Sequence, residues 1–308
     1  MNILCIIASI FLCVCQSFAA TQMDVKALSE LSENEINVGI VALVLAKEVF
    51  PDIDVADYSA KIDDIVIEVK KLTRGSQDPN CRVRALNAYL YKVYGMQYDL
   101  DDPYVENDVN RYINGILENR KGSCVSMPLL YLSVAQRLGY PVCAVSLPQH
   151  IILRYVDPKL KRQNIEATGG GGYSSDDEYI ATLQISPDAL KYGTYLRTLT
   201  HREFLGLLIE QNGIYWGLHG DNEKAMDYLE TAIKLNPRAA DSIRSLGVCY
   251  RIQSKKMKEP LSIEYEMKAN SCFMKARQLG ATNLPLNDYM ETQRKAQEEF
   301  RKNRKLKE

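Results

Sequence analysis

The sequence has few histidines and lacks the paired cysteines of structural zinc sites, and it has no excess of charge. Its 308 residues include only three histidines, and no two of its eight cysteines form a C-x-x-C pair. Because structural zinc sites combine such pairs with nearby ligands, no metal is expected, and nothing implies an organic cofactor. Lys and Arg number 38 against 39 Asp and Glu, a formal charge of -1. This balance gives no basis for nucleic-acid binding, so partners must be inferred from local sites.

The cysteines are too scattered to form a disulfide framework. Cys5, Cys13 and Cys15 lie near the N-terminus, and the other five are widely spaced. Since five is an odd number, at least one thiol is expected to stay free. The five are Cys81, Cys124, Cys143, Cys249 and Cys272.

Residues 1–20 carry no charge and contain an apolar run from Ile3 to Cys15. Ser17 and Ala19 follow, a small-x-small pattern typical of a signal-peptide cleavage site. We therefore expect an exported protein, periplasmic or secreted, that is free of the membrane after cleavage. Because the n-region lacks Lys and Arg, an uncleaved membrane anchor and lipid attachment at Cys15 remain as alternatives.

Apolar residues recur at helical spacing over most of the next hundred residues. The expected helices cover residues 34–50, 54–72, 83–94 and 109–119. Pro51 and Gly95 directly follow two of these segments, and residues of this kind commonly end helices. The N-terminal part is therefore predicted to be helical.

Gly122 and Ser123 introduce another predicted helix. The apolar positions at helical spacing are Met127, Leu130, Val134 and Leu138. Pro128 is tolerated only in the first turn of a helix, so the helix should begin within a residue or two of Cys124. The unpaired N–H groups and the positive dipole end at such a position favour a thiolate.

Two adjacent strands are predicted after this helix, at residues 142–147 and 150–155. His150 opens the second strand. After a charged loop, residues 164–168 form a short third strand, whose alternation places the carboxylate of Glu166 on one face. A carboxylate thus follows the histidine on a neighbouring strand.

Cys124, His150 and Glu166 are the residue types that a thiol nucleophile requires. The thiolate attacks, the imidazole moves the proton, and the acid orients the imidazole. Each residue alone has an ordinary structural explanation in packing or solvation. The cysteine at a helix start, followed by the histidine and the carboxylate on neighbouring strands, favours a site in which Cys124 attacks an amide carbonyl. The backbone N–H of Cys124 would help to stabilise the oxyanion.

Several stretches around these residues resemble the transglutaminase-like superfamily. They are Asn87–Tyr91, Asp102-Pro103, Ile113–Gly122, Leu129–Leu132, Arg137–Gly139 and Pro148–Tyr155. The chain is most similar to a bacterial branch with a helical N-terminal part and C-terminal tetratricopeptide repeats.

This resemblance implies a papain-like α+β core, with a cysteine helix packed on a small antiparallel sheet. It implies Cys124 as nucleophile, His150 as general base and acid, and Glu166 as the orienting group. The chain departs from the family pattern at two positions. The acid is more commonly aspartate, and Gln149 stands where this branch often has glycine.

Four glycines, Gly169 to Gly172, directly follow the third strand. No Gly-Lys-Ser/Thr follows them, which excludes a phosphate-binding P-loop. The two expectations are a mobile loop beside the cleft, continuing through Asp176–Glu178, and a plain flexible connection.

The C-terminal third contains an internal repeat. The residues that mark the first tetratricopeptide unit are Gly213, Trp216, Ala225, Leu229, Ala232 and Pro237. A second unit begins at Leu246-Gly247 and resumes at Ala269 after an insertion. Two units leave a stacking face exposed, so we expect them to pack on the core, on a capping helix near residues 286–300, or on a protein partner.

The predicted fold class is therefore α+β, a transglutaminase/papain-like core followed by an all-α repeat domain. The predicted segments are a signal peptide (1–20), a transglutaminase-like domain (21–200, with a helical part at 21–120 and the core at 121–200), two repeats (201–290) and a charged tail (291–308). The predicted function is a cysteine hydrolase or acyltransferase acting on a peptide or protein substrate. The competing hypothesis is an inactive scaffold whose repeats bind a protein.

Overall fold

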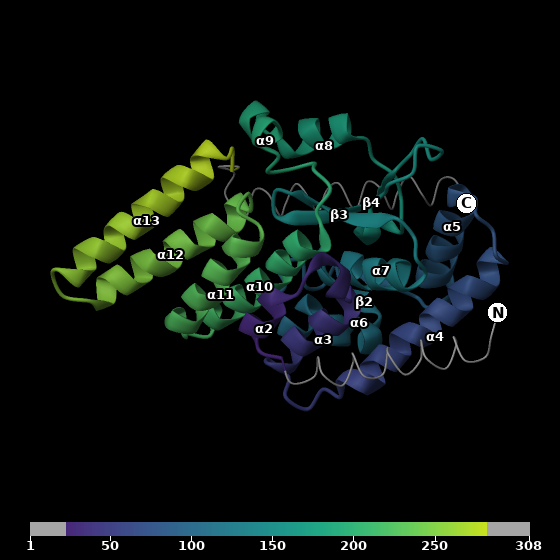
Figure 1. Cartoon of the computed structure of the whole chain (residues 1–308), viewed down its shortest axis with the longest axis horizontal. Coiled ribbons are helices and arrows are strands. Elements are labelled where there is room, and N and C mark those ends of the chain that lie inside the picture. Colours follow the sequence, from purple (N-terminus) through teal and green to yellow (C-terminus); the bar gives the residue numbers. More distant parts are fainter. Residues whose placement is uncertain (1–22, 282–308) are drawn as a thin grey trace.

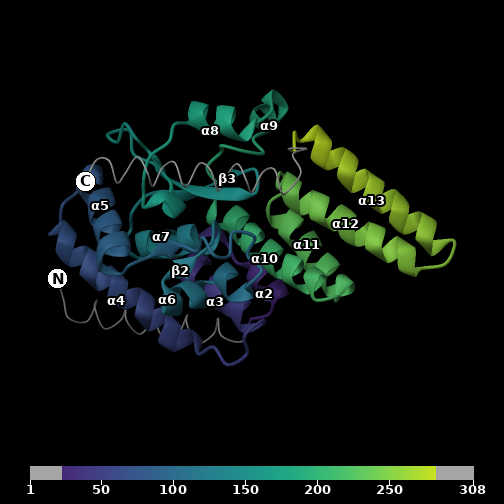
Figure 2. The same ribbon diagram turned by 180° about the vertical axis from the view of Figure 1, so that it is seen from behind.

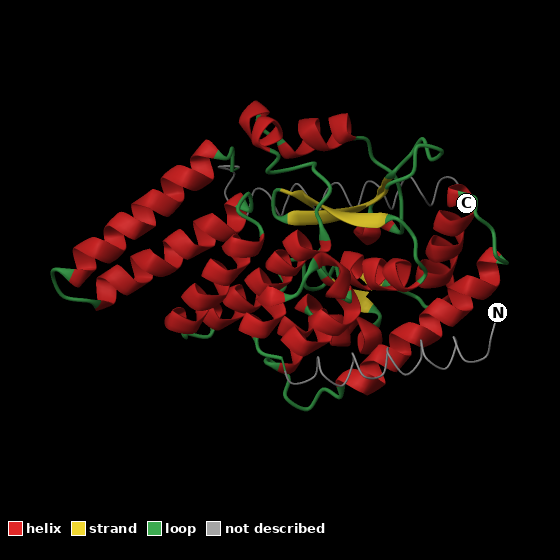
Figure 3. Cartoon of the chain, in the orientation of Figure 1, coloured by secondary structure: helices red, strands yellow, loops and turns green. Residues whose placement is uncertain are grey.

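The computed structural model describes residues 23–281 and shows a helix-rich α+β protein (Figures 1 and 2). Helices surround a small three-stranded antiparallel sheet, so the predicted fold class is confirmed (Figure 3). The expected signal peptide, the capping helix near 286–300 and the charged tail at 291–308 lie outside the described residues. Over residues 23–281, no helix has the length and apolar content needed to cross a membrane.

The N-terminal part is built around one almost entirely buried helix, α3 (Val38–Lys47). Apolar residues occupy every side of α3, which suits a helix at the centre of a core. Asn37 caps it by accepting a hydrogen bond from the N–H of Ile40 at 3.1 Å. The longer α4 (Val55–Thr73) packs beside it and is capped by Asp54.

The other N-terminal elements are short. They are α2 (Val25–Glu30), η1 (Glu33–Glu35), α5 (Pro79–Asn87), the π-helical turn η2 (Ala88–Val93), the 3-10 turn η3 (Asp108–Arg111) and α6 (Ile113–Asn119). The helix expected at 83–94 begins earlier than predicted, because Asp78 caps it and Pro79 occupies its first position.

The helix expected at 109–119 is divided at Tyr112 into η3 and α6. Gly115 allows the two parts to fold back on each other. A Cβ atom there would lie 2.0 Å from the carbonyl oxygen of Val109, so only glycine permits this approach.

The central sheet has the order β3 (Val142–Leu147), β4 (His150–Tyr155) and β5 (Asn164–Ile165), all antiparallel. Leu147 pairs directly with His150, so the hairpin turn has only two residues. The third strand is shorter than predicted, because the chain turns into a 3-10 helix, η4 (Ala167–Gly169), directly after Glu166.

The two faces of the sheet are covered by different helices (Figure 1). On β4, Ile151 and Leu153 face the main core and helix α7 (Ser126–Arg137). Ile152 points the other way, into a smaller apolar cluster under α8 (Asp176–Leu183) and α9 (Pro187–Tyr192).

Helix α8 corrects one sequence expectation. Residues Asp176–Glu178 were expected in a loop, but they form the first turn of α8. Ser175 and Glu178 form a reciprocal capping box at its start, which fixes the helix at this point. The sequence missed both α8 and α9, which cover the outer face of the sheet.

The C-terminal part consists of two antiparallel helix pairs that pack like repeats. They are α10 (His201–Leu218) with α11 (Asn222–Leu235), and α12 (Ala240–Lys256) with α13 (Leu261–Gln278). Glycine permits the close approach within each pair. A Cβ atom at Gly213 would lie 3.0 Å from Leu229, and one at Gly247 would lie 2.9 Å from Phe273. The predicted insertion lengthens α12 and α13 and forms the turn between them.

The repeats are joined to the core at both ends. Helix α10 contributes Leu205 and Ile209 to the main core, and Asn212 donates a buried hydrogen bond to the carbonyl of Leu45 at 2.9 Å. Just beyond α13, the carbonyl of Leu279 accepts a hydrogen bond from Thr194 at 2.6 Å. The second helix pair extends away from the core between these attachments (Figures 1 and 2).

Candidate active site

Cys124 lies in a tight turn two residues before the first residue of α7. Ser123 Oγ accepts hydrogen bonds from the N–H groups of Val125 and Ser126, at 3.2 and 3.3 Å. Ser126 Oγ in turn accepts from Ser123 N–H at 2.9 Å and donates to the carbonyl of Asn110 at 2.7 Å. These bonds supply the cap of α7 and hold the cysteine at the end of the helix.

A two-stranded parallel ribbon leads into this turn. β1 (Gln97–Tyr98) pairs with β2 (Lys121–Gly122), and Tyr98 stands opposite Gly122. A Cβ atom at Gly122 would lie 2.7 Å from Ser126 Oγ, which explains the glycine. Tyr98 is buried close to the sulfur: burial and the nearby charge of Cys124 both raise the pKa of its hydroxyl.

His150 is the first residue of β4, directly after the two-residue turn. Gln149 in that turn has φ of 51°, in the left-handed region that favours glycine. This backbone conformation accounts for the glycine that the related branch often carries at this position. The thiol of Cys124 lies 3.8 Å from the carbonyl oxygen of Gln149, so the sulfur contacts the hairpin that carries the histidine.

The structure brings Cys124, His150 and Glu166 together. His150 Nε2 lies 2.9 Å from Glu166 Oε2, and the side chain of Cys124 is close enough to His150 to influence the pKa of its imidazole. Because Nε2 is engaged by the carboxylate, Nδ1 is the ring nitrogen left for the sulfur. The His150 side chain is buried, with 3% of its surface exposed, whereas Cys124 is partly exposed.

The electrostatics of the histidine–glutamate pair favour an imidazolium beside a carboxylate. Burial alone would lower the pKa of His150, but the charge of Glu166, the hydrogen bond to Glu166 and the interaction with Cys124 raise it to about 10. Burial alone would raise the pKa of Glu166. The charge of His150 and the hydrogen bonds from His150 and Thr168 outweigh it, and the pKa lies below the usual glutamate range.

The glycine run forms an ordered turn behind the acid. The N–H groups of Gly169 and Gly171 donate to the carbonyl of Glu166 at 3.1 and 3.0 Å, and Glu166 N–H donates to Gly172 at 2.8 Å. Gly171 has φ of 73°, and a Cβ atom there would lie 2.3 Å from Asn87 Oδ1. The glycines therefore permit a tight reversal against α5.

Helix α5 and η2 anchor this turn through polar contacts. Asn87 Nδ2 donates to the carbonyl of Gly171 at 2.9 Å, and Tyr91 donates to the carbonyl of Ala167 at 2.7 Å. Tyr131 of α7 donates to Asn87 Oδ1 at 3.0 Å, which links the cysteine helix to the same network. Asn87 and Tyr91 belong to a stretch that resembles the family, and the structure shows their role in holding the acid.

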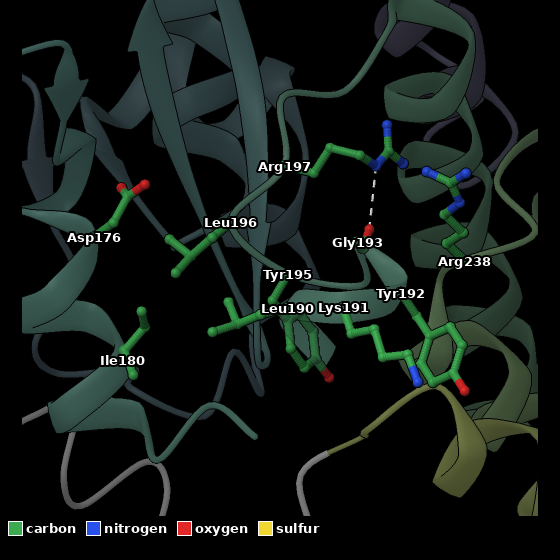
Figure 4. Close-up of a pocket in the computed structure, with 10 residues that line it drawn as sticks. All are labelled: Asp176, Ile180, Leu190, Lys191, Tyr192, Gly193, Tyr195, Leu196, Arg197 and Arg238. Atoms are coloured by element: carbon green, nitrogen blue, oxygen red, sulfur yellow. Dashed lines mark hydrogen bonds between the residues drawn. The ribbon is translucent and has the colours of Figure 1, made fainter. Parts of the chain in front are cut away.

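A cavity lies apart from Cys124, His150 and Glu166. It has a volume of about 460 Å³ and lies between α8, α9 and the turn before α12 (Figure 4). Its lining residues are Asp176, Ile180, Leu190, Lys191, Tyr192, Gly193, Tyr195, Leu196, Arg197 and Arg238. Neither the cysteine nor its partners line it. Within residues 23–281, no cluster of three or more His, Cys, Asp or Glu side chains could hold a metal ion.

The family assignment follows from sequence comparison as well as from this geometry. The sequence profile described as the transglutaminase-like superfamily matches residues 56–209, which is half of the chain. The chain therefore belongs to the transglutaminase-like superfamily. The match begins within α4 and continues through the Cys124 turn and the sheet to the start of α10.

The chain is also similar in sequence to three curated proteins. A UPF0162 protein of Xylella fastidiosa (strain Temecula1 / ATCC 700964) is 23% identical over 230 residues, 72% of this chain and 80% of the relative. F-box only protein 21 of Homo sapiens is 33% identical over 124 residues, 34% of this chain but only 19% of that protein. Photosystem I assembly protein Ycf3 of Rippkaea orientalis is 27% identical over 147 residues, 46% of this chain and 80% of the relative. No solved structure gives a significant match.

Proposed function

We propose that this protein is a cysteine-dependent hydrolase or acyltransferase that acts on amide bonds of a peptide or protein substrate. The observation that carries the proposal is the position of His150, which is hydrogen bonded to Glu166 and opens the strand after the hairpin turn that the Cys124 sulfur contacts. A thiol, an imidazole and a carboxylate in this order are the groups that nucleophilic thiol catalysis needs.

In the proposed reaction, His150 holds the proton on Nδ1 as an imidazolium, and the Cys124 sulfur attacks the substrate carbonyl as a thiolate. The backbone N–H of Cys124, at the start of α7, helps to stabilise the negative oxygen of the tetrahedral intermediate. The C–N bond then breaks as His150 gives this proton to the leaving amine. The thioester is released either by water, giving a carboxylic acid, or by a second amine, giving a new amide.

Selective alkylation of Cys124 tests this proposal. We expect iodoacetamide at neutral pH to modify Cys124 at least about tenfold faster than Cys81, Cys143 and Cys272, as followed by peptide mass spectrometry. Those three cysteines are also partly exposed, so they control for accessibility. His150→Ala should slow the modification of Cys124 and leave the other rates unchanged.

Equal labelling of all partly exposed cysteines would overturn the proposal and leave the scaffold hypothesis. If Cys124 is selectively reactive, a fluorescent primary amine and a glutamine-containing protein distinguish the two reactions. Incorporation of the amine indicates transfer, whereas release of ammonia without incorporation indicates hydrolysis. Cys124→Ser is the control in both assays.

A further inference from the structure

Both oxygens of the Glu166 carboxylate accept more than one hydrogen bond. Oε2 accepts from His150 Nε2 at 2.9 Å and from the Tyr179 hydroxyl at 3.0 Å. Oε1 accepts from the N–H and the hydroxyl of Thr168, at 3.1 and 2.6 Å. Thr168 is part of the same turn as Glu166, but Tyr179 comes from α8 on the outer face of the sheet.

Helix α8 holds Tyr179 in a fixed position relative to the sheet. The first residue of the helix, Asp176, accepts hydrogen bonds from Arg154 on β4 and Asn164 on β5, both at 2.7 Å. The ring of Tyr179 is 9% exposed and packs in the apolar cluster that contains Ile152 of β4. The hydroxyl therefore reaches the carboxylate from a rigid support and not from a mobile loop.

The Tyr179 hydroxyl is a permanent donor at this position. Burial and the charge of Glu166 raise the pKa of the hydroxyl well above its usual value, so it keeps its proton at any physiological pH. A donor on Oε2 stabilises the ionised carboxylate and restricts its rotation about the terminal bond. Both effects keep Oε2 directed at His150 Nε2.

We propose that Tyr179 is a positioning residue of this site, which holds Glu166 ionised and oriented so that His150 presents Nδ1 to Cys124. This inference rests on the proposed function, because it assigns Tyr179 a role in preparing the same thiol. Tyr179 itself acts through Glu166 and does not touch the sulfur in this arrangement.

Tyr179→Phe tests the inference because it removes the hydroxyl and keeps the ring. Loss of one hydrogen bond to a charged acceptor should raise the pH at which Glu166 takes up a proton by about one unit. A neutral Glu166 no longer stabilises an imidazolium, so the acid side of the pH profile for Cys124 alkylation should move to higher pH. Because Glu166 stays ionised at neutral pH in both proteins, the alkylation rate there should change much less than on the acid side of the profile.

Tyr195→Phe is the matched control. Tyr195 is 3% exposed, belongs to the same apolar cluster, and donates to a different carboxylate, Asp241, at 3.0 Å. This substitution should cost comparable stability but leave the alkylation profile of Cys124 unchanged. A merely structural role for Tyr179 would make the two variants behave alike.

Histidine NMR gives a readout that does not depend on thiol reactivity. The chain has only three histidines, so ring ¹⁵N signals can be assigned with a His150→Gln variant. In Tyr179→Phe, the acid-side transition of the His150 ring signals should move to higher pH. If it moves while Cys124 is not selectively reactive, the positioning role stands and the proposed catalysis fails. If Cys124 is selectively reactive but neither profile changes in Tyr179→Phe, the positioning role is wrong and the proposed function stands.

Discussion

Glu210 is a buried carboxyl group whose surroundings favour its neutral form over its ionised form. It lies on α10, is 6% exposed, and faces Asp241 and Arg244 of α12. Burial raises the pKa of Glu210 to about 7, and the charge of Asp241 adds to this effect. Because the carboxyl is neutral when buried and ionised in the unfolded chain, this residue should make folding pH-dependent.

We expect the parent protein to lose about 3 kcal/mol of stability from Glu210 as the pH rises from below 4.5, its ordinary pKa, through about 7. Glu210→Gln should remove this loss. Urea unfolding at pH 5.5 and pH 8.5 measures the later part of this loss, about 2 kcal/mol, and the difference in unfolding free energy between parent and variant should be larger at the higher pH. The raised pKa of His150 also makes the protein less stable as the pH rises. This effect is the same in the parent protein and in Glu210→Gln, so it cancels in the comparison. An equal difference at both pH values would contradict the prediction.

At the scale of elements, the cap of α7 fixes the position of Cys124. Ser126 is fully buried, and its hydroxyl satisfies both Ser123 N–H and the Asn110 carbonyl. Ser126→Ala should leave both groups unpaired, cost about 2 kcal/mol of unfolding free energy, and slow the alkylation of Cys124.

Ser133→Ala is the control for this prediction. Ser133 is equally buried in α7, but its hydroxyl donates only to the carbonyl of Leu129 within its own helix, at 2.7 Å. Its loss should cost less stability and leave the alkylation rate unchanged. Chemical denaturation and a timed labelling reaction give the two quantities, and similar behaviour of both variants would argue against a special role for the cap.

The elements that carry the candidate site were largely predictable from the sequence. Pro128 located the start of α7 to within a few residues, and the two predicted strands have the bounds that β3 and β4 show. The shortened third strand was not predicted, because η4 is held by hydrogen bonds between Glu166 and the glycine turn that the sequence pattern does not reveal.

Contacts between distant segments could not be predicted in this way. Asn87 and Gly171 are 84 residues apart and meet only because α5 packs against the turn. Tyr179 reaches Glu166 because α8 folds over the outer face of the sheet, and its local sequence shows only the capping box at Ser175. Periodicity and spacing report on local structure and contain no information on such packing.

At the scale of the whole molecule, the second helix pair packs on α11 through an apolar cluster, and a polar contact ties the far end of α13 to the core. Thr194 is buried, and its hydroxyl donates to the carbonyl of Leu279 at the end of α13. Thr194→Val should weaken this contact, and we expect faster proteolysis within α12 and α13 with no change in Cys124 alkylation.

Thr231→Val provides the comparison, because the Thr231 hydroxyl bonds only to the carbonyl of Asp227 in its own helix, at 2.9 Å. Limited digestion followed by mass spectrometry locates the cleavage sites. Identical digestion patterns for the two variants would show that the Thr194 contact does not hold the repeats in place.

Helix α10 belongs to the main core through Leu205 and Ile209 and to the repeats through Gly213. One uninterrupted helical rod of 18 residues, about 27 Å long, therefore replaces the linker that separates most neighbouring domains. Any rotation of the first helix pair against the core would therefore have to bend α10 or pull Leu205 and Ile209 out of their packing.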